Sequence, residues 1–251
     1  MSASLLQSWF ALPHAWIGAL ALISFWTAAL AGKGSKAHRY AGRVFLLAML
    51  GILITALPLT LSTWLRGQPV WAVFLAYLVI LVGVNCLNAW RAIRHRADFS
   101  SYANAGFQAG ALVLGLAGLG VVAVGIKYGA AILIAFGAIG PLAAWQNLKL
   151  ARRGPSDRQW WLRSHYGAMI GNGVATHIAF FQIGLGRLFT DLGNSMIIHI
   201  AWLGPLVVGG LIGYMLDRRW ARSKKPSDSP APASLTPLAG ETAASIRSPK
   251  S

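Results

Sequence analysis

The chain has 251 residues, of which 56% are hydrophobic and only 11% are charged, and its mean hydropathy is +0.56. A water-soluble domain of this length cannot bury so much apolar surface, so the composition excludes a soluble globular protein and indicates an integral membrane protein. The formal net charge is +16, but the basic residues stand in short blocks between apolar runs of about 20 residues, the length of a membrane-spanning helix. We therefore assign the charge to membrane topology and expect no nucleic-acid partner.

Seven apolar segments follow one another along the chain, and each is long enough to cross a bilayer as a helix. They cover residues 9–31, 44–65, 70–90, 105–126, 129–148, 165–186 and 195–216. The sequence thus predicts an all-α integral membrane protein with one domain, residues 1–222, that forms a single bundle of about seven transmembrane helices. Residues 223–251 are rich in Pro, Ser, Ala and Thr, which predicts a disordered cytoplasmic tail.

The basic residues alternate between consecutive loops. Seventeen of them fall in the first, third and fifth loops and just after the last segment, whereas the second, fourth and sixth loops hold one each. Lysine and arginine collect on the cytoplasmic side of membrane proteins. We therefore predict that the N-terminus lies outside and the C-terminus in the cytoplasm.

Acidic residues are missing from all seven segments, because the six in the chain lie in loops, at a helix end or in the tail. Carboxylate-bound metal centres, paired-carboxylate hydrolases and acid-based proton relays are therefore excluded from the membrane interior. The single cysteine, Cys86, excludes an internal disulfide and any multi-cysteine metal or iron–sulfur site. Histidines, amides and hydroxyls remain as the polar groups of the interior.

The histidines form two layers when each is placed by its position along its segment, at about 1.5 Å per helical residue. His14, His177 and His199 lie toward the outer face, and His38, His95 and His165 lie at or near the cytoplasmic face, with His38 and His95 in loops. Two layers of imidazoles without nearby acids suit b-type haem, whose iron is held by neutral imidazoles from different helices. The alternative is that each histidine is an interhelical hydrogen bonder or an interface residue.

The sixth segment carries an unusually polar face. His165, Met169, Asn172 and Thr176 recur at intervals of four, three and four residues, which places them on one side of a helix. We expect this stripe to face the bundle, where it either lines a ligand pocket or joins helices by hydrogen bonds. His177 is rotated about 120° from His165 around the helix, so these two histidines do not share one narrow face.

The first loop, GKGSKAHRYAGR at residues 32–43, holds four basic residues among three glycines. Gly34 is expected to take a positive φ in a tight turn, and Gly42 is expected to allow close approach as the second segment begins. We interpret the loop as a topology anchor and also as a shaped cytoplasmic cap in which His38 meets another element. Anionic lipid head groups are the simplest external ligand for its basic residues.

Two motifs resemble those of a widespread bacterial family of predicted multi-pass membrane proteins of unknown function. The first, Lys-Gly-x3-His-Arg-x2-Gly-Arg, follows the first helix and is carried by Lys33, Gly34, His38, Arg39, Gly42 and Arg43, with His14 before it. The second is a later helix built on Trp, His and Met with an Ala-Phe pair near its end, matched by Trp161, His165, Met169, Ala179 and Phe180. The chain departs from the family at His177, where a threonine is expected. The resemblance implies a multi-pass protein of a bacterial cytoplasmic (inner) membrane and supplies no reaction.

Two classes of function remain open. A b-type haem-binding or quinone-linked electron-transfer protein would use the outer histidines His14, His177 and His199 and the inner histidines His38 and His165. A transporter or lipid-handling protein without a cofactor would line a path with the polar stripe of the sixth segment. That alternative predicts discontinuous helices, with candidate break points at Pro58, Pro141 and Pro205.

Overall fold

The structure is a computed structural model that describes residues 2–188 and 195–222. These ranges form seven long helices and one short helix: α1 (Ala3–Leu30), α2 (Lys36–Leu65), α3 (Pro69–Arg94), α4 (Phe99–Tyr102), α5 (Ala105–Lys127), α6 (Ala131–Arg153), α7 (Trp160–Leu188) and α8 (Ser195–Arg222). No strand occurs in them, so the predicted all-α class is confirmed. The predicted tail, residues 223–251, lies outside the described residues.

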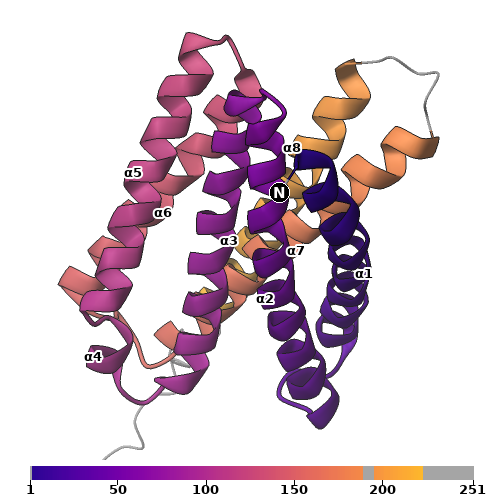
Figure 1. The fold of residues 1–251 in the computed structure, drawn as a ribbon. Coiled ribbons are helices and arrows are strands. Elements are labelled where there is room, and N and C mark those ends of the chain that lie inside the picture. Colours follow the sequence, from indigo (N-terminus) through magenta and orange to yellow (C-terminus); the bar gives the residue numbers. More distant parts are fainter. Residues whose placement is uncertain (1, 189–194, 223–251) are drawn as a thin grey trace, which may run out of the picture.

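Six of the long helices are apolar enough to cross a membrane, namely α1, α2, α3, α5, α6 and, over Ile200–Trp220, α8. The chain is accordingly a multi-pass membrane protein. Helix α7 has 29 residues, and it carries the polar stripe identified in the sequence. It packs along α3 and α8 and contacts α1, so it belongs to the same bundle (Figure 1).

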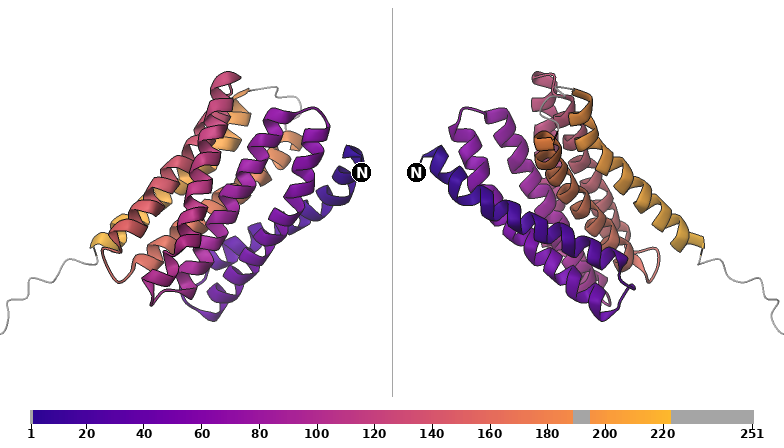
Figure 2. Two further views of the ribbon diagram at one scale, coloured as in Figure 1. Left: turned by 60° about the vertical axis from the view of Figure 1, so that its left-hand side comes forward. Right: turned by 90° about the vertical axis from the view of Figure 1, so that its right-hand side faces the viewer.

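Helix α3 occupies the centre of the bundle. Helices α1 and α2 form one pair and α5 and α6 another, while α3 contacts α2, α5 and α7 (Figure 2). One core cluster, around Phe74 and Tyr77, joins α3, α5, α6 and α7. A second core cluster, around Phe45 and Met49, joins α1, α2, α3 and α7. The second cluster adjoins the residues that the sequence marks as functional candidates.

Glycines bring α5 and α6 into close contact. A Cβ atom on Gly118 would lie 2.6 Å from the Gly137 carbonyl oxygen, and one on Gly140 would lie 2.6 Å from the Leu114 carbonyl oxygen. Side chains at these positions would therefore push the two backbones apart.

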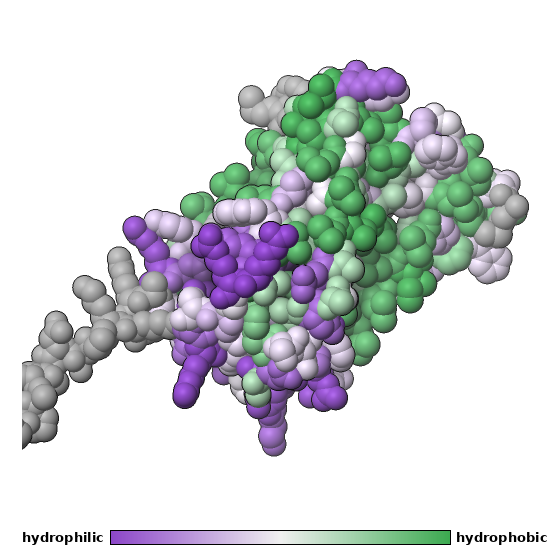
Figure 3. Space-filling model, turned by 90° about the vertical axis from the view of Figure 1, so that its left-hand side faces the viewer, coloured by the Kyte–Doolittle hydropathy of each residue, from purple (hydrophilic) through white to green (hydrophobic). Residues whose placement is uncertain are grey.

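Hydrophilic residues gather at one end of the molecule. The connections 31–35, 95–104 and 154–159 and the C-terminal end of α8 all lie at this end (Figure 1). The space-filling view shows the hydrophilic residues concentrated there, next to a broad apolar belt (Figure 3). The loops that are basic in the sequence thus share one end of the bundle, which we call the basic end.

Two predictions about helix starts and helix continuity were wrong. His38 lies in the first turn of α2 and not in a loop, because Ser35 caps that helix: its Oγ accepts a hydrogen bond from the His38 backbone N–H at 3.1 Å. Helices α2, α6 and α8 run without interruption through Pro58, Pro141 and Pro205, so these prolines are not break points. The helices also extend beyond the predicted apolar segments, since polar residues continue a helix beyond the apolar run.

Candidate functional site

The Lys-Gly-x3-His-Arg motif folds as a cap over the C-terminal end of α1. Gly34 has the predicted positive φ, at +79°, and turns the chain toward α2. Lys33 Nζ donates hydrogen bonds to the carbonyl oxygens of Ala28 at 3.3 Å and Ala29 at 2.5 Å, and the Arg39 guanidinium donates to the Gly34 carbonyl. The two Lys33 contacts satisfy backbone acceptors that the last turn of α1 leaves free.

His38 completes this cap. Its Nδ1 lies 2.9 Å from the Ala28 carbonyl oxygen, so the predicted contact of His38 with another element is made with α1. Because a carbonyl oxygen only accepts hydrogen bonds, Nδ1 carries the proton, and the lone pair of the neutral ring is on Nε2.

His165, in the second turn of α7, is held in the same way. Its Nδ1 lies 3.1 Å from the carbonyl oxygen of Ala89, a fully buried residue of α3, and therefore also carries the proton. His165 stands near the start of α7, as His38 stands near the start of α2. Neither Nε2 atom makes a hydrogen bond with the described part of the chain. The two inner histidines thus both lie near the basic end of the bundle, and we call them the inner pair.

Gly42 lies one turn after His38 on the same side of α2. A Cβ atom at Gly42 would meet no atom within 4 Å, so the predicted role of this glycine in close helix approach is wrong. The space beside the His38 side of α2 is open instead.

His14 marks a different level of the bundle. Its Nδ1 donates to Thr55 Oγ1 at 2.8 Å, because that hydroxyl already donates its own proton to a backbone carbonyl of α2. Thr55 lies 17 residues after His38 on α2, which is about 25 Å along the helix axis. The predicted outer and inner levels of histidine are therefore well separated.

The other two outer histidines differ from His14. His177 uses both ring nitrogens: Nδ1 donates to the Gly173 carbonyl at 2.7 Å, and Nε2 accepts from Trp26 Nε1–H at 3.0 Å. Its ring is thereby fixed between α7 and α1 with no free lone pair. His199 lies on α8, but its side chain is outside the described residues. His95 follows α3 as its C-terminal cap residue, away from any helix interior.

The polar stripe of α7 faces the bundle, as predicted. Asn172 is fully buried, Thr176 is buried, and Met169 packs against the second core cluster. The Thr176 hydroxyl donates to the Asn172 carbonyl at 2.9 Å and lies 3.5 Å from the sulfur of Met49 on α2. The stripe therefore joins α7 to α2 through buried polar and sulfur atoms.

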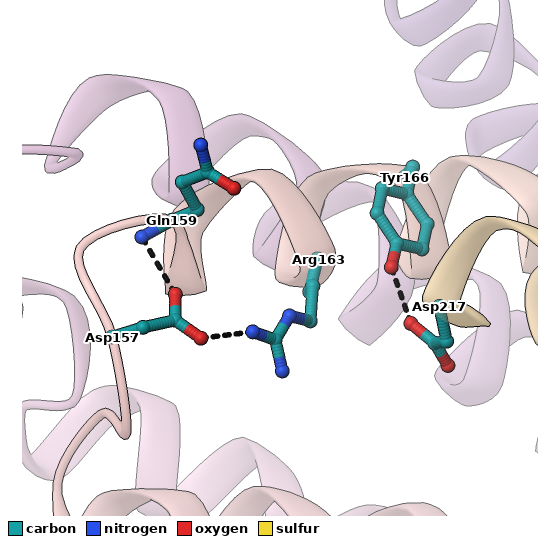
Figure 4. A network of polar contacts seen from close by, with 5 residues as sticks. All are labelled: Asp157, Gln159, Arg163, Tyr166 and Asp217. Atoms are coloured by element: carbon teal, nitrogen blue, oxygen red, sulfur yellow. Dashed lines mark hydrogen bonds and ion pairs between the residues drawn. The ribbon is translucent and has the colours of Figure 1, made fainter. Parts of the chain in front are cut away.

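A second polar network holds the beginning of α7 (Figure 4). Asp157 accepts a hydrogen bond from the Gln159 backbone N–H at 2.7 Å and forms a salt bridge with Arg163. Tyr166, one turn further, donates its hydroxyl proton to Asp217 on α8. These contacts hold the first two turns of α7 in place, and none of them involves a bound ligand.

The inner pair offers two imidazole nitrogens from two helices. Among residues 2–188 and 195–222, no three His, Cys, Asp or Glu side chains gather as a group that could hold a metal ion. Two imidazoles are too few for a metal site built from protein ligands alone, but two imidazoles would suffice to hold a haem iron. Comparison with protein-family models, curated proteins and solved structures gave no match for this chain.

Proposed function

We propose that this protein is an electron-transfer protein that binds haem b between His38 and His165. The proposal depends on one observation: each ring gives its Nδ1 proton to a backbone carbonyl and keeps an unbonded lone pair on Nε2. Backbone carbonyls hold metal-ligating histidines in this way, since the hydrogen bond fixes the tautomer and orients the ring. A haem bound there would supply one-electron chemistry at its iron.

The residues around the inner pair fit such a group. The two histidines come from α2 and α7, and each is held by a carbonyl of a further helix, so both rings are oriented before a ligand arrives. A Cβ atom at Gly42, one turn after His38, would meet no atom within 4 Å, so no neighbouring group packs against α2 at that point. Helices α1, α2, α3 and α7 carry no Asp or Glu, so no carboxylate competes for the imidazoles.

The proposal includes the topology. We take α7 as a seventh span, because its 29 residues are about 43 Å long and lie inside the bundle beside α3 and α8. We place the basic end in the cytoplasm of a bacterial cell, against anionic lipid head groups. A reporter that is active only in the cytoplasm should give signal when fused after Ser251. Silence there, with signal from an N-terminal fusion, would overturn this orientation.

The absorbance spectrum of the purified full-length protein tests the haem proposal. Protein expressed with added haem should show a Soret band and, after reduction, resolved α and β bands. His38→Ala and His165→Ala should each lose this spectrum, whereas His177→Ala is the matched control and should keep it, because Trp26 already occupies its Nε2. A folded wild-type protein without a Soret band would contradict the proposal.

The alternative is a transporter or lipid-handling protein without a cofactor. The described helices give it no specific support, because α2, α6 and α8 are continuous through their prolines. The buried stripe of α7 is compatible with both functions.

A further inference from the structure

Three sulfur-containing side chains belong to the second core cluster or pack against it. Met49 of α2 is 2% exposed, and Cys86 of α3 and Met169 of α7 pack against the same cluster. The three side chains come from three helices, and none of them is needed for the proposed haem ligation.

Asn172 lies next to this sulfur group without a satisfactory partner. The Thr176 hydroxyl links it to this group, since it donates to the Asn172 carbonyl at 2.9 Å and lies 3.5 Å from the Met49 sulfur. By distance and angle, neither Nδ2 nor Oδ1 of Asn172 makes a hydrogen bond, although the residue has no exposed surface. A buried amide with both polar atoms unpaired is rare in native proteins, so Asn172 has donor and acceptor capacity available for a bound group.

We propose that Met49, Cys86 and Met169 form a binding site for a bare Cu(I) ion. Thiolate and thioether sulfur are the ligands that Cu(I) prefers. Because α1, α2, α3 and α7 carry no Asp or Glu, the Cys86 thiol is the group that can balance the charge of the ion. Its S–H bond breaks as the S–Cu bond forms, the proton leaves to solvent, and the resulting Cu(I) thiolate is neutral. A neutral complex can be buried in the membrane core at low cost.

The close packing around Asn172 restricts what can bind. Since this residue has no surface accessible to water, no water-sized void adjoins it, which excludes a hydrated cation or an organic molecule. A bare ion requires only small movements of the flexible methionine side chains. The Asn172 Nδ2–H group would then donate to the Cys86 thiolate, as outer-shell groups do at metal sites.

Titration of the full-length protein with Cu(I) against a chromophoric Cu(I) chelator, in detergent and without oxygen, tests this site. We expect one tightly bound ion per chain, and no such ion in Cys86→Ser. Met49→Leu and Met169→Leu keep the side-chain volume but remove a ligand, so both should weaken binding. Asn172→Leu should weaken binding about 10–100-fold, as the loss of an outer-shell partner does. Met215→Leu is the matched control, because this thioether on α8 is exposed, and it should bind as the wild type does.

X-ray absorption of the copper-loaded chain should show sulfur ligands alone. Nitrogen ligands, or an unchanged affinity in Cys86→Ser, would place the ion at histidines and overturn the proposal, as would a folded wild type that takes up no Cu(I). The double variant His38→Ala, His165→Ala separates this site from the haem site. It should lose the Soret band and keep Cu(I) binding.

Discussion

Removing the two inner histidines separately and together distinguishes a pair of ligands from two unrelated hydrogen bonds. His38 donates to Ala28 on α1 at 2.9 Å, and His165 donates to Ala89 on α3 at 3.1 Å. Without haem, each alanine substitution removes one hydrogen bond and should lower the free energy of unfolding by about 0.5–1.5 kcal/mol. Because the two acceptors are separate, the losses should add to within about 0.5 kcal/mol.

Bound haem should change this result. A ligand present at 100 times its Kd stabilises the native state by about 2.7 kcal/mol. If both rings bind the iron, either single substitution removes this stabilisation, and the double substitution cannot remove it a second time. The loss in the double variant should then be smaller than the combined single losses by about 2.7 kcal/mol.

Unfolding of the detergent-solubilised wild type and the three variants, followed by circular dichroism with and without haem, measures both quantities. The pair His38→Ala and His177→Ala serves as the control, and its losses should add under both conditions. Additive losses for His38 and His165 in the presence of haem would refute the ligand pair and leave His38 as part of the α1 cap alone. No loss at all for His38→Ala would refute the cap as well.

Four further substitutions test separate features. Gly118→Ala should lower the free energy of unfolding by about 1–3 kcal/mol, because a Cβ atom there would lie 2.6 Å from a backbone carbonyl of α6. Gly120→Ala, where a Cβ atom meets nothing within 4 Å, should be neutral or stabilising by up to about 1 kcal/mol in the same measurement. His177→Ala should cost about 0.5–1.5 kcal/mol through its lost bond to α1 and leave the haem spectrum unchanged; a lost spectrum would make His177 a ligand. Hydrogen bonds, chiefly from the Ser101 hydroxyl, lower the pKa of the exposed Asp98 carboxyl to about 2 from its ordinary value of 3.8. A carboxyl whose pKa is lower in the native state than in the unfolded state stabilises the fold at any pH above its unfolded-state pKa. This stabilisation is lost as the pH falls through the native-state pKa. The difference in Tm between wild type and Asp98→Asn should therefore close between about pH 4 and pH 2.

Local composition was enough to predict the membrane class and the gathering of the basic loops at one end of the bundle. An apolar run of about 20 residues crosses a bilayer whatever its neighbours are. The alternation of basic loops can likewise be read by counting lysines and arginines between successive apolar runs. The inward face of α7 was also predictable, because a spacing of four, three and four residues places His165, Met169, Asn172 and Thr176 on one side of any helix. The capped start of α2 was missed although Ser35 stands three residues before His38 in the sequence, a spacing typical of an N-cap.

Only the tertiary structure decided which of these residues meet. The sequence places His14 and His177 at one level. Because α1 packs against α7, however, the Nε2 of His177 accepts a hydrogen bond from Trp26. It likewise places Met49 and Cys86 on different segments, with no pattern that joins them into one cluster. The period of a helix follows from its own residues and fixes which of its side chains share a face. The rotation and register of one helix against another depend on the packing of all their contact residues at once, and the contacts of the inner pair follow from that packing.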